Sequence, residues 1–181
     1  RWRVIAADMP GRGASERLAD PMLYQVPTYV ANAVTLLARL DVETVDWVGI
    51  SLGGLMGMAL GAFERSPIRR LAISDAGPIL ARAAIERIAS YVGVSPAFPT
   101  RAAAYAAIRA ISEPFGPHTD AQWDFLVDNV LVRRDDGTYA LHYDPAIGVP
   151  FRAALAVPGD VYLWGQCDAV RAPTMVICGE R

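Results

Sequence analysis

Apolar residues in this chain occur in two patterns that alternate along the sequence. Short continuous apolar runs at residues 45–50 and 71–74 have the length and composition of buried strands. Apolar residues at helical spacing fill residues 27–41 and 52–64, before and between those runs. Strands that alternate with helices predict a parallel sheet covered on both faces. We therefore expect an α/β fold, with a further short apolar strand at residues 3–7.

After Pro78 the strand pattern stops, and helical spacing continues for about fifty residues. Two apolar stripes mark helices, and their members are Leu80, Ala84, Ile88 and Val92, then Tyr105, Ile108 and Ile111. Thr119 and Gln122 form a capping-box pattern that predicts a third helix, and Asp136-Gly137 predicts a small hairpin. A strand pattern returns only at residues 173–178. Residues 79–172 are therefore interpreted as a mostly helical insertion between two neighbouring strands.

The sequence Gly49-Ile50-Ser51-Leu52-Gly53 joins the apolar run at residues 45–50 to the helical pattern that follows it. Gly-x-Ser-x-Gly at such a junction is typical of a strand-to-helix turn that holds the serine in a strained backbone conformation. Only very small residues fit two positions away from the serine, and both are glycine here. Ser51 is therefore a candidate nucleophile.

Composition and charge narrow the classes of partner. The chain has 181 residues, 53% of them apolar, which suits a folded domain with a substantial core. The net charge of -2 comes from 17 basic and 19 acidic residues without long runs, so we expect no nucleic-acid partner and no anionic membrane surface. Cys167 and Cys178 are too few for a disulfide framework and lack metal-ligand spacing. A reducing, cytoplasmic setting without a bound metal is predicted.

The charge-free window at residues 47–63 is nearly long enough to be considered as a membrane span. It contains Gly53, Gly57 and Gly61 in small-xxx-small spacing, which also lets a water-soluble helix pack closely against a sheet. Five glycines and a serine make the window a poor span, so we expect no membrane-spanning segment. The first residues show no signal-peptide pattern, and a signal lying before Arg1 is left open.

Four segments together resemble the α/β-hydrolase superfamily. They are Asp8-Met9-Pro10-Gly11-Arg12-Gly13 with Ser15, Val48-Gly49-Ile50-Ser51-Leu52-Gly53-Gly54, Ser74-Asp75-Ala76-Gly77-Pro78, and Ala172-Pro173-Thr174-Met175-Val176-Ile177-Cys178-Gly179-Glu180. The resemblance implies a partial parallel sheet with the strands equivalent to the family's fourth to seventh. It divides the chain into a core segment at residues 1–78, a helical cap at 79–172 and a return to the core at 173–181.

The resemblance also implies roles for three residues. Ser51 would be the nucleophile, and the backbone N–H of Leu52 would be half of the oxyanion hole, which stabilises negative charge in the transition state. Asp75 follows the strand after which some members place their catalytic acid, so it is the candidate acid within this chain. The family's second oxyanion donor would precede Arg1, and its usual acid and its histidine would follow Arg181.

The order of strands in the family predicts that the chain is an interior part of a longer protein. The family's third strand lies between the strands equivalent to residues 3–7 and 45–50. Without it these two strands would flank a gap of about 9.6 Å with unpaired backbone groups.

The two histidines and the polar residues of the loop at Asp8 are expected to have structural roles. If residues 139–144 form a strand, His142 lies with Ala140 and Asp144 on its less apolar face, as a solvated or hydrogen-bonded side chain. His118 lies in a loop by its neighbours and has a similar interpretation. Asp8 and Arg12 are expected to fix their loop. Gly11-Arg12-Gly13 does not open a helix directly, which disfavours a phosphate cradle.

These observations favour a serine hydrolase that cleaves a carboxylic ester or related acyl compound through an acyl-enzyme on Ser51. Serine at this turn argues against the haloalkane dehalogenases and epoxide hydrolases of the family, whose nucleophile is a carboxylate. No cofactor is expected, and the oligomeric state is left open. Aromatic residues in the insertion favour a small apolar acyl substrate, and they are Phe98, Phe115, Trp123, Phe125, Phe151 and Trp164.

Several alternatives share the fold. The chain could belong to a carbon-carbon bond hydrolase, a lactonase, an acyltransferase or a cofactor-free haloperoxidase. From another class, it could belong to a non-catalytic ligand-binding module that kept the fold and lost the triad.

Overall fold

The computed structural model describes residues 2–179, which form two compact units. The first, here called the hairpin unit, combines the described residues up to Ala19 with Tyr91–Gly148. The second, the sheet unit, combines Asp20–Ser90 with the described residues from Val149 onward. The predicted division has a core segment at residues 1–78, a cap at 79–172 and a return to the core at 173–181. It does not coincide with these two units, and it stays a prediction. Glu180 and Arg181, at the end of the predicted return, lie outside the described residues.

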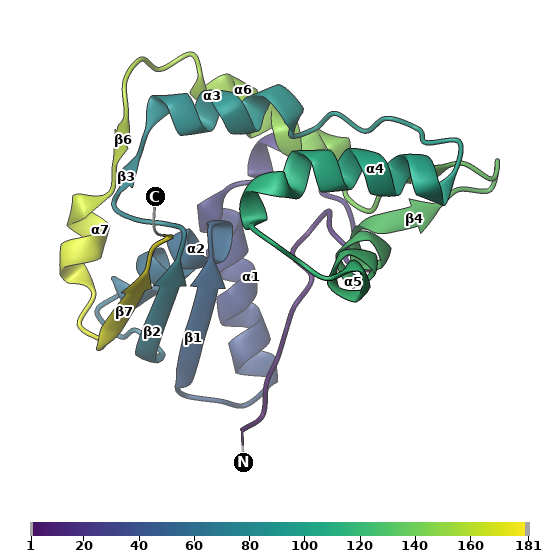
Figure 1. Ribbon diagram of the computed structural model, residues 1–181. Coiled ribbons are helices and arrows are strands. Elements are labelled where there is room, and N and C mark those ends of the chain that lie inside the picture. The colour runs from purple at the N-terminus through teal and green to yellow at the C-terminus, as the bar shows by residue number, and fades with distance from the viewer. Residues whose placement is uncertain (1, 180–181) are drawn as a thin grey trace. The chain divides into compact units, whose positions relative to one another are not determined.

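The sheet unit is built on three parallel strands (Figure 1). They are β1 (Val45–Ile50), β2 (Ile68–Ser74) and β7 (Thr174–Ile177), in the order β1-β2-β7. Ser74 pairs with Ile50 on one side and with Ile177 on the other, so the three strands end in register. The parallel sheet confirms the predicted α/β class, and the strand at 173–178 is confirmed next to β2.

Helices and a short ribbon complete the sheet unit: η1 (Pro21–Leu23), α1 (Val26–Arg39), α2 (Leu52–Gly61), α3 (Arg82–Tyr91), α6 (Gly148–Ala154), α7 (Trp164–Ala169), and the antiparallel pair β3 (Ile79–Leu80) and β6 (Val161–Tyr162). Helix α2 is apolar on all sides because it packs against β1, β2 and α1. Its residues Met56, Met58 and Leu60 are buried, as are Tyr29 of α1 and Leu71 of β2. These side chains form the core between the sheet and the helices α1 and α2.

Arg82, the first residue of α3, fastens this helix to the segment that follows α6. Its guanidinium donates to the backbone oxygen of Val157 at 2.5 Å and of Leu155 at 3.0 Å, and to Glu86 at 2.7 Å. Its backbone N–H donates to the Asp160 carboxylate at 2.8 Å. The base of the predicted insertion is therefore closed by side-chain hydrogen bonds as well as by the β3–β6 pair.

The hairpin unit contains α4 (Arg101–Ser112), η2 (Glu113–Phe115), α5 (Asp120–Val130), β4 (Leu131–Arg133), β5 (Tyr139–Leu141) and η3 (Pro145–Ile147). The predicted capping box is present, because Thr119 and Gln122 hydrogen-bond reciprocally at the start of α5. The predicted hairpin is also present. β4 and β5 pair antiparallel around Gly137, whose φ of 84° requires a glycine-like conformation.

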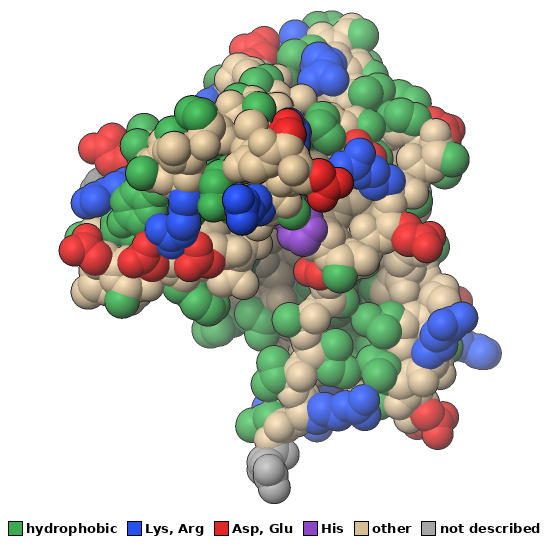
Figure 2. Space-filling model, turned by 90° about the vertical axis from the view of Figure 1, so that its right-hand side faces the viewer, with side chains coloured by type: hydrophobic (Ala, Val, Ile, Leu, Met, Phe, Trp, Pro, Cys, Tyr) green, Lys and Arg blue, Asp and Glu red, His purple; other side chains and the backbone are tan. Residues whose placement is uncertain are grey.

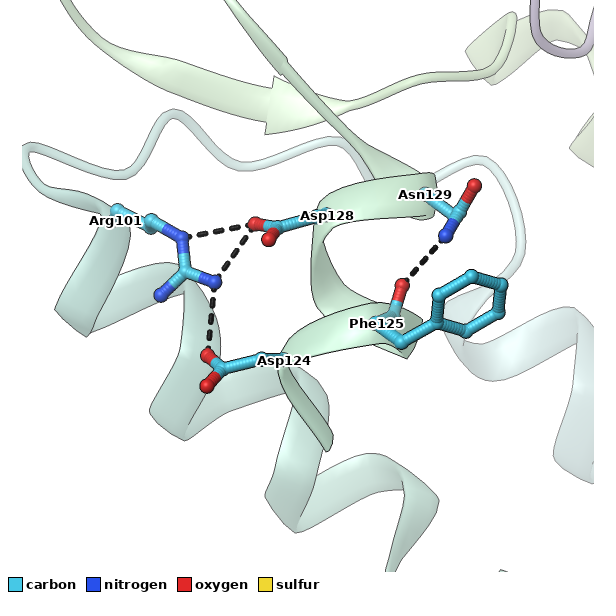
Figure 3. Close-up of polar contacts among 5 residues, drawn as sticks. All are labelled: Arg101, Asp124, Phe125, Asp128 and Asn129. Atoms are coloured by element: carbon cyan, nitrogen blue, oxygen red, sulfur yellow. Dashed lines mark hydrogen bonds and ion pairs between the residues drawn. The ribbon is translucent and has the colours of Figure 1, made fainter. Parts of the chain in front are cut away.

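Arg101 links the two long helices of the hairpin unit (Figure 3). Its Nε donates to Asp128 at 2.9 Å, and its Nη2 donates to Asp124 at 2.9 Å and to Asp128 at 2.7 Å. The two aspartates are four residues apart on α5 and so lie on one helix face. On the other side of α5, Asn129 donates to the backbone oxygen of Phe125 at 2.7 Å.

Two predictions about strands were wrong. Residues 3–7 are not a strand, because no segment of residues 2–179 pairs with them, and Val4 and Ile5 are 86% and 47% exposed. The strand expected at 139–144 ends at Leu141, and its faces are reversed. Ala140 is 2% exposed because β5 packs against α4, whereas Tyr139 and Leu141 are half-buried.

Within residues 2–179, no helix combines the length and the apolarity needed to cross a membrane. The charge-free window at residues 47–63 instead contains the end of β1 and all of α2.

Candidate active site

Ser51 occupies the turn between β1 and α2, with φ of 49° and ψ of -113°. This left-handed conformation is strained for a residue with a side chain. The backbone is held on both sides of the residue. The Ser51 N–H donates to the Ser74 oxygen at 2.9 Å, and the Ser51 oxygen accepts from the N–H of Gly54 at 2.9 Å and of Leu55 at 3.1 Å. Ser51 is exposed, so its hydroxyl is accessible at the carboxyl edge of the sheet.

The glycines around Ser51 do not share the steric role that the sequence pattern predicts. A Cβ atom on Gly49 would lie 2.1 Å from the backbone oxygen of Gly53, so this position requires glycine. A Cβ on Gly54 would meet Ile73 Cγ2 at 2.9 Å and Ala76 Cβ at 3.0 Å. A Cβ on Gly53 would meet nothing within 4 Å. The need for a small residue therefore falls on Gly49 and Gly54, and Gly53 is sterically free.

Trp47 holds the turn at Ser51 in place through a hydrogen bond to α2, a role that was not predicted from the sequence. Its indole Nε1 donates to the backbone oxygen of Gly53 at 2.9 Å, which ties the first turn of α2 to β1. The approach depends on Gly57, because a Cβ there would lie 2.7 Å from Trp47 Cδ1 and 2.8 Å from Leu71 Cδ1. The spacing of Gly57 after Ser51 was the available signal for this close packing.

Leu52 is the first residue of α2, where backbone N–H groups have no partner inside the helix. Within the described residues, no acceptor is recorded for the Leu52 N–H. The N–H adds to the partial positive charge at the start of α2, which favours negative charge beside Ser51. The geometry therefore suits a donor to an oxyanion.

Asp75 directly follows β2, and its φ of 50° is also left-handed. Its N–H donates to the Ile177 oxygen at 3.3 Å. Since Ile50 and Ser74 are paired, Ser51 and Asp75 are the next residues on strands about 4.8 Å apart. Asp75 is exposed, and within residues 2–179 its carboxylate makes no recorded hydrogen bond or ion pair. The structure thus places the two candidate residues side by side at one edge of the sheet.

Comparison with known families gives a match along the chain. A family model described as alpha/beta hydrolase fold matches residues 1–180. This chain belongs to the α/β hydrolase fold family. Among solved structures, a putative hydrolase from Rickettsia typhi has a TM-score of 0.83 at 27% identity, covering 92% of this chain and 56% of that one. An α/β hydrolase from Novosphingobium aromaticivorans has a TM-score of 0.81 at 32% identity, covering 93% and 60%.

Two curated relatives of this α/β hydrolase bear functional names. The 3-hydroxybutyrate-oligomer hydrolase of Cupriavidus necator is 45% identical over 186 residues, which covers 99% of this chain and 64% of that protein. The 2-hydroxymuconate semialdehyde hydrolase of a Pseudomonas species is 44% identical over 71 residues, covering 39% of this chain and 25% of that protein. The chain therefore spans less than two thirds of the length of either relative.

Both histidines of this α/β hydrolase belong to the hairpin unit, whereas Ser51 belongs to the sheet unit. His142 has an exposed side chain, and its backbone N–H donates to the Val130 oxygen at 2.7 Å. His118 is half-buried, with its ring 4.8 Å from the ring of Trp123 and its Nδ1 2.9 Å from the Gly116 oxygen. The exposed side chain of His142 agrees with its predicted solvated state, and His118 lies in a loop as predicted.

The loop at Asp8 is held by its own side chains, as predicted. The Asp8 carboxylate accepts from the Ala14 N–H at 2.9 Å, and the Asp8 backbone oxygen accepts from the Ser15 hydroxyl at 2.7 Å. A Cβ on Gly13 would lie 2.2 Å from the Asp8 carboxylate, so glycine is needed for this closure. Among the residues that the structure describes, no group of three acidic, histidine or cysteine side chains could hold a metal ion.

Proposed function

We propose that the full-length protein is a serine hydrolase that cleaves esters of short hydroxycarboxylic acids through an acyl-enzyme on Ser51. The observation that carries the proposal is the left-handed backbone of Ser51, which presents an exposed hydroxyl at the start of α2. The 3-hydroxybutyrate-oligomer hydrolase of Cupriavidus necator, with 45% identity over 99% of this chain, supports the class of substrate.

In the proposed reaction the Ser51 Oγ forms a bond to the carbonyl carbon of the ester, and its proton passes to a general base. The Leu52 N–H donates to the oxygen that becomes negative. The base then protonates the leaving alcohol, and water releases the acid from Ser51. We propose that the longer protein supplies the base and the second oxyanion donor outside this chain, with Asp75 as the candidate acid within it.

We propose that residues 79–172 act as a cap over the substrate of the full-length enzyme. We also propose a cytoplasmic setting, because Cys167 and Cys178 are both free thiols and Cys178 is exposed.

The second candidate is a carbon-carbon bond hydrolase, which the 44% identity to the 2-hydroxymuconate semialdehyde hydrolase favours. That identity covers 39% of the chain, whereas the ester-hydrolase match covers 99% and so includes the predicted cap. We therefore rank ester hydrolysis first. Parallel assays on 3-hydroxybutyrate oligomers and on 2-hydroxymuconate semialdehyde separate the two, because turnover of only the second would reverse the ranking.

A serine-directed fluorophosphonate probe tests the proposal. We expect the probe to label the full-length protein at Ser51, as located by mass spectrometry of the labelled peptide, and to spare the Ser51→Ala variant. Ser90→Ala is the control, because Ser90 is an exposed serine on α3 and its loss should leave labelling unchanged. A folded full-length protein that resists the probe would favour the non-catalytic ligand-binding alternative.

A further inference from the structure

The hairpin unit carries an open cavity of about 460 Å³ where the end of α4 meets the start of α5. It is lined by Arg109, Glu113, Gly116, Pro117, His118 and Trp123. Its volume lies within the range of roughly 300–1,000 Å³ that small-molecule sites occupy. We propose that this cavity binds a short hydroxycarboxylate with a free hydroxyl, the class of acid that the proposed reaction releases. The identity of the ligand rests on the proposed function, whereas its chemistry follows from the lining residues.

Arg109 supplies a positive charge without an acidic partner. Its guanidinium lies 5.7 Å from the ring centroid of Trp123, and within residues 2–179 it makes no recorded ion pair. Arg101, two turns earlier on α4, differs because Asp124 and Asp128 both neutralise it. A planar guanidinium that lies beside a ring and makes no ion pair is suited to a carboxylate, which it can bind through two parallel hydrogen bonds.

His118 supplies a hydrogen-bond acceptor. Its Nδ1 lies 2.9 Å from the Gly116 backbone oxygen, and a carbonyl oxygen only accepts, which assigns the proton of the neutral ring to Nδ1. Nε2 is then left with a lone pair, and within the described part of the chain it has no recorded partner. A hydroxyl group on the ligand can donate to Nε2. An esterified oxygen cannot, so this residue selects the free hydroxy acid over the acid end of an oligomer.

Trp123 gives the cavity a fixed apolar wall. It is 4% exposed and contacts both the guanidinium of Arg109 and the ring of His118. The donor and the acceptor are therefore positioned by the same buried ring before a ligand arrives, which reduces the ordering cost of binding. Pro117 extends the apolar lining for the short carbon chain that links the ligand's carboxylate to its hydroxyl.

Glu113 opposes the binding of an anion. Its carboxylate is part of the lining, and like charges repel, so it weakens the affinity for a carboxylate ligand. The cavity thus contains one residue whose neutralisation should weaken binding and one whose neutralisation should strengthen it. Substitution of Arg109 and of Glu113 should therefore change the affinity for the carboxylate in opposite directions.

Isothermal titration of 3-hydroxybutyrate into the full-length Ser51→Ala protein measures binding without turnover. We expect the Arg109→Gln substitution to weaken binding about tenfold or more, and Glu113→Gln to tighten it. Butyrate, which lacks the hydroxyl, and methyl 3-hydroxybutyrate, which lacks the carboxylate, should each bind at least about tenfold more weakly than 3-hydroxybutyrate. Arg133→Gln is the control, because Arg133 is an exposed arginine on β4 outside the cavity lining, and its loss should leave the affinity unchanged.

Equal affinity in the Arg109→Gln and unsubstituted proteins would overturn the inference, as would no binding of 3-hydroxybutyrate. If Arg109→Gln fails to fold by circular dichroism, the ligand comparison on the unsubstituted background decides, and equal binding of butyrate would overturn the inference. Fluorophosphonate labelling of Ser51 without 3-hydroxybutyrate binding would remove this inference and leave the proposed function standing. Binding of 3-hydroxybutyrate without labelling of Ser51 would remove the proposed function and leave the binding of a hydroxycarboxylate in this cavity standing.

Discussion

Gly49 and Gly53 flank Ser51 symmetrically in the sequence but have different surroundings in space. A Cβ on Gly49 would collide with backbone atoms of Gly53, and a Cβ on Gly53 would meet nothing within 4 Å. We expect Gly49→Ala to lower the free energy of unfolding by about 2–4 kcal/mol, because backbone atoms of α2 must move. We expect Gly53→Ala to raise it by about 0.5–1 kcal/mol, because alanine favours the helix.

Denaturant unfolding of the two full-length variants measures this contrast, and each serves as the other's control. Equal destabilisation by both substitutions would show that the pentapeptide pattern, rather than the packing of the individual glycines, governs the turn.

The sequence predicted the position of Ser51 because the pentapeptide at residues 49–53 encodes a local backbone geometry. Trp47 could not be found in the same way. Its hydrogen bond to Gly53 joins residues on two elements and becomes visible only when β1 and α2 are packed. His118 was correctly placed in a loop, but its tilted ring contact with Trp123 joins that loop to the first turns of α5 and was not indicated by the sequence pattern.

Among the elements, α3 is attached in part by the side chain of its first residue, Arg82. Replacing Arg82 by glutamine removes the bonds that its guanidinium makes to Glu86 and to the backbone oxygens of Leu155 and Val157. We expect Arg82→Gln to lower the free energy of unfolding by about 1 kcal/mol, since the site is partly open to solvent. Arg87→Gln on the exposed face of the same helix is the control, and chemical denaturation that gives equal midpoints for both would contradict the assignment.

The pairing of β1 with β2 includes an ion pair that predicts a pH dependence. Arg69 donates to both carboxylate oxygens of Asp46, at 2.9 and 2.7 Å, and this hydrogen bonding holds the pKa of Asp46 below its ordinary value of 3.8. A depressed pKa in the folded state contributes stability that is present above 3.8 and is lost as the pH falls through the folded pKa.

We therefore expect the Asp46→Asn variant to lose stability less steeply than the unsubstituted protein on acidification. Denaturant midpoints measured between about pH 6 and about pH 2 test this expectation. Asp135→Asn is the control, because within the described residues the Asp135 carboxylate makes no recorded bond. Parallel acid curves for the Asp46→Asn and unsubstituted proteins would remove the role of this ion pair.

Elements with a strong internal pattern were predicted with nearly their observed bounds. β1 coincides with the predicted run, and α5 begins at its predicted capping box. Residues 3–7 were predicted wrongly because a strand also needs a neighbour for its hydrogen bonds, and an apolar run does not report whether one is present. The faces of β5 were reversed because alternation alone does not determine which face α4 covers.

The whole molecule exposes apolar side chains on both outer strands of its sheet. Val48 and Ile50 of β1 are 79% and 68% exposed, and Met175 and Val176 of β7 are 57% and 56% exposed. Figure 2 shows that acidic, basic and hydrophobic side chains are otherwise mixed on the face in view, without segregation by charge. Edge strands with exposed apolar side chains favour association between molecules.

We expect the purified 181-residue chain to associate as its concentration rises, as measured by light scattering after gel filtration. Val48→Lys should reduce this association because a charge on an edge strand opposes pairing. Val34→Lys, at a 43% exposed position of α1, is the control and should not reduce it. A chain that stays monomeric at about 0.1 mM would contradict the role of these edges.

The left-handed backbone at Ser51 also bears on how this position can evolve. Such a conformation costs a residue with a Cβ about 1–3 kcal/mol, and glycine would relieve most of that cost. Random drift under selection for stability alone would therefore lead away from serine at position 51. A lineage that keeps serine there is retaining a residue that is unfavourable for stability, which is expected where function requires it.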